Sequence, residues 1–157
     1  MARLYRLCRV ANMIELLATS IITLSSVALF GYWFRYVCLM ILNTKTAQDY
    51  AGQVAEANQL GFLGVRAALQ ANAADLDRLR DVLDRDYEIL SRLLTQATSL
   101  EQSGMEKSML EMNYKLMHSW YAVCSRFSPA AAARALDEMS QVVAHFANVM
   151  GECAAAA

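Results

Sequence analysis

The sequence predicts an all-α protein in which a single N-terminal transmembrane helix precedes a helical bundle or helical-hairpin domain. Three features predict this fold: an uncharged apolar run near the N-terminus, a content of only one proline and six glycines, and apolar residues that recur at helical spacing. Apolar residues make up 57% and charged residues 18%, whereas soluble domains have about 45–50% and about 25%. Lipid or a protein interior must cover this excess of apolar surface.

Residues 1–9 form a basic N-terminal flank, because Arg3, Arg6 and Arg9 precede the first acidic residue. Such a flank is retained on the cytoplasmic side of a membrane, or on the matrix side in a mitochondrion-like setting. We therefore expect the bulk of the chain on the opposite side of a bacterial inner membrane or an organellar membrane. The acid-free residues 1–14 are also typical of a mitochondrial transit peptide, which is an alternative reading.

Residues 10–43 are predicted to form the transmembrane helix and an interfacial extension of it. Residues 16–34 contain no charge and no proline, and about 20 such residues cross the roughly 30 Å of hydrocarbon in a bilayer. One alternative is a buried core helix, although a core helix usually shows a polar face. Another is a cleavable signal peptide, whose apolar core is usually about 7 to 15 residues long.

Hydroxyl residues follow one face of the predicted transmembrane helix. Thr19, Thr23 and Ser26 are spaced i, i+4 and i+7, which places them on the same side. Small hydroxyl residues allow a second membrane helix to pack closely and to form hydrogen bonds across the contact. The alternative is that each hydroxyl bonds only to a carbonyl of its own helix.

Residues at the end of the apolar run are predicted to anchor it at the membrane–water interface. Aromatic rings prefer the headgroup level, and an arginine side chain can extend to the same depth. These predicted anchors are Tyr32, Trp33, Arg35 and Tyr36.

Residues 44–157 are predicted to form an extramembrane helical domain. We expect one helix over 46–70, although Gly52, Gly61 and Gly64 each cost up to about 1 kcal/mol relative to Ala. Further helices are expected over 74–102, 105–127 and 129–151. Short breaks imply antiparallel neighbours in an up-and-down bundle, the alternative being two hairpins whose apolar faces contact other subunits.

A leucine seam runs along the predicted helix 74–102, with the 3-4 spacing of a coiled-coil-like packing face. It comprises Leu76, Leu79, Leu83, Leu90, Leu93 and Leu100. Asp86 interrupts the seam. The spacing predicts a partner helix but leaves open whether that helix lies in this chain or in another.

The last two predicted helices also carry apolar residues at helical spacing. In the first of them these residues are Met105, Met109, Met112, Leu116, Trp120, Val123 and Phe127. The methionines are expected to be ordinary core residues, the alternative being an adaptable binding groove. Ser128 and Pro129 predict a helix start, and Gly151 predicts the end of that helix.

No spacing of reactive residues predicts an enzyme or a cofactor site. The cysteines lie at positions 8, 38, 124 and 153, and no two of them have the spacing of a CxxC motif. His118 and His145 are expected about 10 Å apart along a bundle axis, a poor match for paired haem ligands. The net charge of -1 and the lack of a basic aromatic patch argue against nucleic acid as a partner. We expect no enzymatic activity and no cofactor.

The expected function is that of a non-catalytic single-pass membrane protein, acting as an accessory, scaffold or assembly subunit of a larger complex. Its expected partners are membrane lipid and other membrane-protein subunits or further copies of itself. The alternative is a membrane-anchored sensor or carrier that binds a small apolar ligand or, less favoured, haem. That ligand would occupy a pocket among Met112, Leu116, Trp120, Met139, Val143 and Phe146.

Overall fold

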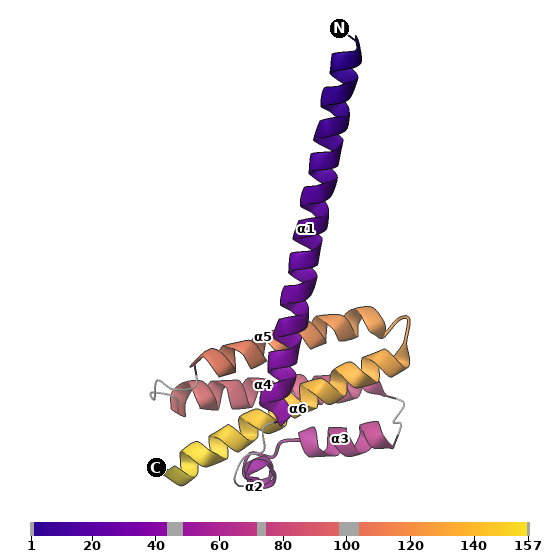
Figure 1. The fold of residues 1–157 in the computed structure, drawn as a ribbon. Helices are drawn as coiled ribbons and strands as arrows, with labels where there is room; N and C mark the ends of the chain where they lie inside the picture. The colour runs from indigo at the N-terminus through magenta and orange to yellow at the C-terminus, as the bar shows by residue number, and fades with distance from the viewer. Residues whose placement is uncertain (1, 44–48, 72–74, 98–103, 157) are drawn as a thin grey trace. The chain divides into compact units, whose positions relative to one another are not determined.

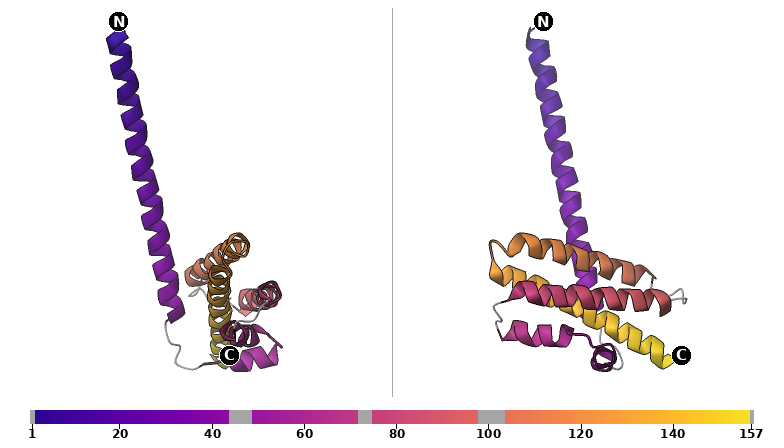
Figure 2. Two further views of the ribbon diagram at one scale, coloured as in Figure 1. Left: turned by 90° about the vertical axis from the view of Figure 1, so that its right-hand side faces the viewer. Right: turned by 180° about the vertical axis from the view of Figure 1, so that it is seen from behind.

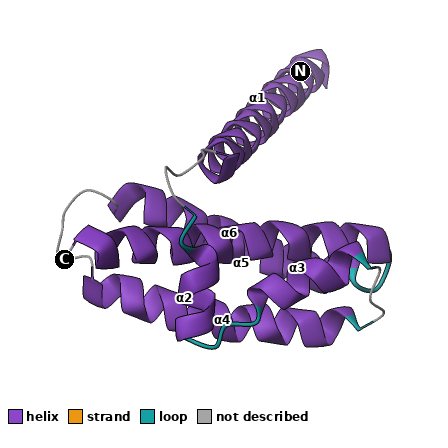
Figure 3. Cartoon of the chain, turned by 90° about the horizontal axis from the view of Figure 1, so that it is seen from below, coloured by secondary structure: helices purple, strands orange, loops and turns teal. Residues whose placement is uncertain are grey.

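The computed structural model describes residues 2–43, 49–71, 75–97 and 104–156, and 91% of them are helical. The described residues contain no strand, so the predicted all-α class is confirmed (Figure 3). The helices are α1 (Ala2–Asn43), α2 (Ala51–Ala57), α3 (Phe62–Gln70), α4 (Leu76–Ala97), α5 (Gly104–Cys124) and α6 (Pro129–Ala156) (Figure 1).

The chain divides into two compact units, Met1–Leu39 and Met40–Ala157. The first unit is a single helix, formed by most of α1. The second contains the last turn of α1 and the other five helices, and we call these five helices the helical body. Because each unit has its own internal contacts, we describe each by itself.

Helix α6 is the centre of the helical body, since it packs against α2, α3, α4 and α5. Helices α5 and α6 form an antiparallel hairpin, and α4 runs alongside it (Figures 1 and 2). The core around α6 includes Leu136, Met139 and Phe146, all buried. Each such side chain contributes roughly 1.5–3 kcal/mol when removed from water. The body therefore has a hydrophobic core of its own.

Two helices of the body begin at side chains that cap them. The Oδ1 of Asp75 accepts a hydrogen bond from the backbone N–H of Arg78 at 3.1 Å, at the start of α4. The Oγ of Ser128 accepts one from the N–H of Ala131 at 3.3 Å, and Pro129 is the first residue of α6. Both oxygens satisfy an N–H that lacks a partner within its helix. The helix start predicted at Ser128 and Pro129 is confirmed.

The single helix predicted over 46–70 is wrong, because α2 ends at Ala57 and α3 begins at Phe62. Gln59 adopts a positive φ of 54°, and the N–H of Leu60 bonds to the carbonyl of Ala55 at 2.8 Å. The N–H of Gln59 bonds to the carbonyl of Glu56. This pair of bonds is a Schellman motif, usually formed by glycine at the left-handed position. Glutamine gives no such signal in the sequence.

The helix end predicted at Gly151 is also wrong, because α6 continues to Ala156. Gly151 is buried inside this helix, where Tyr50 packs directly against its backbone. A Cβ at this position would overlap the Cβ of Tyr50. The glycine therefore permits a close approach of two segments rather than ending a helix.

Candidate functional site

The first candidate site is the apolar surface of α1. The segment Met13–Asn43 contains an 18-residue window with a mean hydropathy of 1.9, none of which is buried. Residues 13–33 are all exposed, whereas Phe34 and Cys38 are buried. Leu24 and Leu29, for example, are 69% and 70% exposed. By length and composition this helix could span a membrane, although a signal sequence meets the same criteria. An uncovered apolar surface of this size requires lipid or another helix to cover it.

The predicted hydroxyl face of α1 lies within this window. The Thr19 hydroxyl donates to the Glu15 carbonyl at 2.8 Å, and the Thr23 hydroxyl donates to the Thr19 carbonyl at 2.8 Å. These two hydroxyl groups therefore bond to carbonyls of their own helix, which is the alternative prediction for this face. Ser26 continues the same face one turn later. What this face still offers a second helix is a row of small side chains.

The predicted interface anchors lie on the last turns of the apolar window. Tyr32, Trp33 and Tyr36 are all more than half exposed, at 71%, 56% and 57%. Arg35 is half-buried and has a contact of its own. The ring of Phe30 lies 6.4 Å from that of Trp33, which extends the aromatic cluster by one turn. Their position at a membrane surface stays a prediction.

The leucine seam of α4 finds its partner within the same chain. Leu83 and Leu90 are fully buried in the core, and α4 packs on α6 and α3. Leu76, Leu79 and Leu93 are half-buried, Leu76 and Leu79 pack against the core, and Leu100 lies outside the described residues. Leu94, which the seam did not include, is buried as well. Leu83 and Leu90 are therefore not available to a second subunit.

Asp86, the residue that interrupts the seam, is only 2% exposed. Its Oδ2 accepts a hydrogen bond from the backbone N–H of Gly61 at 2.7 Å, beside the first turn of α3. Burial raises the pKa of the Asp86 carboxyl, and the backbone N–H groups of Gly61 and Phe62 partly offset this by favouring the charged form. The aspartate thus joins α4 to the start of α3.

Tyrosines of α5 connect it to α4 through aspartates. No Cα atom of α4 lies within 8 Å of one of α5 over their described residues, so long side chains bridge the space. The hydroxyl of Tyr114 donates to Asp84 at 2.9 Å, and the hydroxyl of Tyr121 donates to Asp77 at 2.9 Å. The rings of Tyr114 and Tyr87 stack with centroids 3.9 Å apart. Polar and aromatic groups therefore hold these two helices together.

The three tyrosines of this contact are held in the protonated form. Burial is the main cause in each case, and it raises the pKa of Tyr87 and of Tyr121 to about 12. The pKa of Tyr114 is raised as well, by burial and by the negative charge of Asp84. A phenol that donates to a carboxylate loses that bond on ionisation, so ionisation opposes the packing of α5 on α4.

The outward side of α5 and the turn that follows it carry an apolar stripe that the body leaves uncovered. Its members are between 47% and 84% exposed, and they are Met105, Met112, Leu116, Trp120, Val123 and Phe127. We call this set the α5 stripe. The expectation that these methionines are core residues is wrong for Met105 and Met112 and holds for Met139, which is fully buried. The inner side of α5 instead buries Leu110, Asn113, Tyr114, Met117, Tyr121 and Cys124.

The charges along α5 are unevenly placed around the α5 stripe. Its two acidic residues lie near the N-terminal end of the helix, and both are paired. Glu106 contacts the Nε2 of His145 at 3.3 Å, and Glu111 contacts the Nζ of Lys107 at 3.7 Å. From Met112 to Phe127 the sequence contains no acidic residue, whereas Lys115 and Arg126 are exposed. This segment, whose last three residues follow the end of α5 at Cys124, is therefore apolar with exposed basic residues beside it.

A buried polar pair links α5 to α6. The Nδ2 of Asn113 donates to the Oε1 of Glu138 at 3.1 Å, and both residues are buried. The Oδ1 of Asn113 has no hydrogen-bond partner. A buried polar pair of this kind penalises any shift of one helix along the other, because a shift leaves both groups unpaired. We interpret this pair as a contact that fixes the register of α5 against α6.

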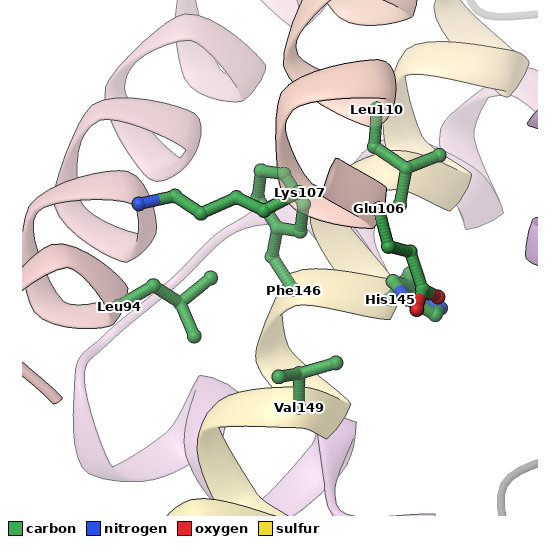
Figure 4. A pocket seen from close by; sticks show the side chains of 7 residues that line it. All are labelled: Leu94, Glu106, Lys107, Leu110, His145, Phe146 and Val149. Carbon is green, nitrogen blue, oxygen red and sulfur yellow. Dashed lines mark ion pairs between the residues drawn. The ribbon is translucent and has the colours of Figure 1, made fainter. Parts of the chain in front are cut away.

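A small cavity lies where α4, α5 and α6 meet (Figure 4). It holds about 30 Å³, and its lining comprises Leu94, Glu106, Lys107, Leu110, His145, Phe146 and Val149. A single water occupies about that volume, whereas sites for small ligands have about 300–1,000 Å³. The cavity as it stands has no room for an apolar ligand.

The pocket predicted for a small apolar ligand is not formed by the six residues named for it. Met112, Leu116 and Trp120 are exposed on the α5 stripe, whereas Met139, Val143 and Phe146 are sealed in the core. Of the six, only Phe146 lines the cavity of Figure 4. The predicted pocket is therefore wrong in its residues, whereas the sensor or carrier alternative itself stays a prediction.

Among the described side chains, the two histidines and the three cysteines form no cluster typical of a metal or haem site. The Nε2 of His118 lies 3.2 Å from Asp84, while His145 contacts Glu106, so the imidazoles have separate partners. Within the described ranges there is no group of three or more His, Cys, Asp or Glu side chains placed to hold a metal ion. Cys124 and Cys153 are free thiols.

Comparison with known proteins adds no family to this description. The chain matches no protein-family model, no curated protein and no solved structure. Its function must therefore be argued from its own surfaces.

Proposed function

We propose that this protein is a non-catalytic single-pass membrane protein that acts as an accessory, scaffold or assembly subunit of a larger membrane complex. The observation that carries the proposal is the 18-residue apolar window of α1, none of which is buried within the chain. Such a helix is stable where lipid surrounds it, because its backbone groups are bonded internally and its side chains need no water. The rest of the chain is free to hold a body beside the membrane.

The proposed topology follows from the charges and rings that flank the apolar run. The basic flank at residues 1–9 stays on the cytoplasmic or matrix side, and the helical body lies on the opposite side. Residues 16–34 cross the hydrocarbon, and Trp33, Arg35 and Tyr36 lie at the second interface. The last turns of α1, to Asn43, then extend beyond the hydrocarbon.

Within the membrane, the hydroxyl face of α1 is the proposed contact with a helix of another subunit or of a second copy. Thr19 and Thr23 bond to their own helix, so close packing of small side chains supports the contact more than hydrogen bonding does. Larger side chains on this face would separate the two backbones. Leu83 and Leu90 have no part in this contact, because they are core residues.

The contact is tested by enlarging the face in the full-length chain. The variant Thr23→Leu with Ser26→Leu keeps α1 apolar but fills the face, so we expect the complex to dissociate in mild detergent on a native gel. The matched control is Ser20→Leu with Ser25→Leu, which also adds two leucines but lies on other sides of α1. We expect the control to migrate like the parent chain.

Two results would contradict the proposal. If both variants migrate with the parent complex, the hydroxyl face is not the contact. If the parent chain itself migrates as a lone protomer after gentle extraction from its native membrane, the chain is not a subunit of a complex. Mass spectrometry of the parent band identifies the partner chains.

A further inference from the structure

We infer that the α5 stripe lies on the surface of the membrane that anchors the chain, with its basic edge against anionic lipid headgroups. This inference rests on the proposed function, since it requires α1 to cross that membrane. It goes beyond it by assigning the outer side of the helical body to lipid. The face concerned runs from Met112 to Phe127, where apolar side chains are exposed beside Lys115 and Arg126.

The side chains of this face are those of helices that lie in a membrane interface. Such helices combine lysine or arginine on a polar edge with Trp, Phe and Leu on the side that enters the headgroup region. Trp120 is 52% exposed and Phe127 is 84% exposed, and both lie on the α5 stripe with Leu116. Trp rings favour the headgroup level, where one side of the ring is apolar and the other is wet.

Charge selects lipid over a second copy of the same face. In a symmetric pair of α5 stripes, Lys115 and Arg126 would meet the segment Met112–Phe127 of the second copy, which contains no acidic residue. The nearest acids on α5, Glu106 and Glu111, are each paired within the body. Anionic headgroups supply the missing negative charge, at about fivefold in the docking equilibrium for each basic residue.

The chain length between α1 and the body keeps the face within reach of the membrane. Helix α1 ends at Asn43 and α2 begins at Ala51, so seven residues (44–50) separate them. When fully extended, seven residues span about 25 Å at most. The start of the body therefore lies no farther from the end of α1 than roughly the 30 Å length of α5. The tethered body therefore meets the membrane surface at a high local concentration.

The two tryptophans of the full-length chain allow the inference to be tested without removing any segment. Trp33→Phe leaves Trp120 as the sole tryptophan, and Trp120→Phe leaves Trp33. Each variant is reconstituted into vesicles of phosphatidylcholine and phosphatidylglycerol that carry a nitroxide quencher either near the headgroup or deep in the acyl chain. We expect Trp120 fluorescence to be quenched strongly by the shallow label, weakly by the deep label and weakly by aqueous iodide.

The basic edge is tested by Lys115→Gln with Arg126→Gln in the Trp33→Phe background. Removing both charges should lower the ratio of docked to free body about 25-fold, so quenching by the shallow label falls and quenching by iodide rises. Vesicles of phosphatidylcholine alone should give the same change in the parent. The matched control is Arg66→Gln with Arg78→Gln, two exposed arginines on α3 and α4, which should leave the quenching unchanged. Circular dichroism verifies that both variants stay helical.

The outcomes separate this inference from the proposed function. If neither lipid label quenches Trp33, α1 is not in the bilayer, and both proposals are overturned. If lipid quenches Trp33 while Trp120 is quenched by iodide alone, only the inference is overturned. If Trp120 is shielded from iodide yet not quenched by lipid, a protein surface covers the α5 stripe, and the inference is again overturned.

Discussion

Helices α4 and α5 have nearly the same length, 22 and 21 residues, and use their apolar residues in opposite ways. Helix α4 places Leu83 and Leu90 in the core and leaves its arginines and most of its acids outside. Helix α5 turns Asn113 and its tyrosines inward and leaves the α5 stripe outside. Both helices pack on α6, so the same partner helix accepts two different kinds of face.

The difference teaches that an aromatic and polar face can serve as the inner side of a helix when its polar atoms are satisfied. Tyr114 and Tyr121 bury their rings while their hydroxyls reach Asp84 and Asp77. Once this face provides the contact with α4, the apolar side chains on the other side of α5 are not needed for the core. They remain available to lipid or to another protein.

The comparison is tested most severely by the same substitution on the two helices. Leu90→Ala should lower the free energy of unfolding by about 2–5 kcal/mol, because Leu90 is fully buried and the change leaves a cavity. Leu116→Ala should change it by less than about 0.5 kcal/mol, because Leu116 is 47% exposed. Urea unfolding of the full-length chain in detergent, followed by circular dichroism, measures both. Equal losses would show that the outer side of α5 is part of the core.

A smaller effect is expected at Asp86, the one acidic residue on the buried face of α4. Asp86→Ala leaves the N–H of Gly61 without its acceptor, and we expect a loss of about 1–3 kcal/mol in the free energy of unfolding. Asp86→Asn keeps an acceptor oxygen and should lose less. An alanine variant as stable as the parent would show that the bond between Asp86 and the N–H of Gly61 does not stabilise the fold.

Asp86 should also make the free energy of unfolding depend on pH. Its pKa in the folded chain is raised above the ordinary value of 3.8, so the folded state holds the proton more tightly than the unfolded state does. The stabilisation is complete below that value and is lost as pH rises through the folded pKa. Asp86→Asn should remove this contribution from the slope of stability against pH in mildly acidic solution, and an unchanged slope would contradict the burial of the carboxyl.

The smallest effect is expected from the tyrosines between the two helices. The pKa values of Tyr87 and Tyr121 are raised to about 12 from an ordinary value of 10.0. The folded state keeps these protons at a pH where the unfolded state releases them, so their stabilising contribution is lost as pH rises from 10 towards 12. A near-ultraviolet titration should show a late phase that Tyr87→Phe and Tyr121→Phe each reduce. A late phase of undiminished size in both variants would contradict the burial of these two side chains.

The helical secondary structure and the start of α6 could be predicted from the local sequence. The leucine seam identified the packing face of α4, but a 3-4 repeat follows a period of 3.5, whereas a straight helix turns every 3.6 residues. The buried face therefore drifts, so that Leu94 is buried while Leu93 is half-buried.

The inner face of α5 could not be read from the sequence. Its apolar residues were the obvious candidates for the core, whereas Tyr114 and Tyr121 gain burial only through aspartates on another helix. Likewise Gly151 reads as a helix end until Tyr50, far away in sequence, is placed against it. Such contacts depend on tertiary packing and leave no periodic signal in the chain.

The most direct test of the whole account is alkaline carbonate extraction of membranes from cells that make the full-length chain, followed by the intact mass of the extracted protein. We predict that the chain stays in the membrane pellet until detergent is added, and that its mass is 17.4 kDa with α1 still attached. Recovery of the chain in the carbonate supernatant, or a mature mass lacking the residues of α1, would contradict the claim that α1 is a membrane anchor.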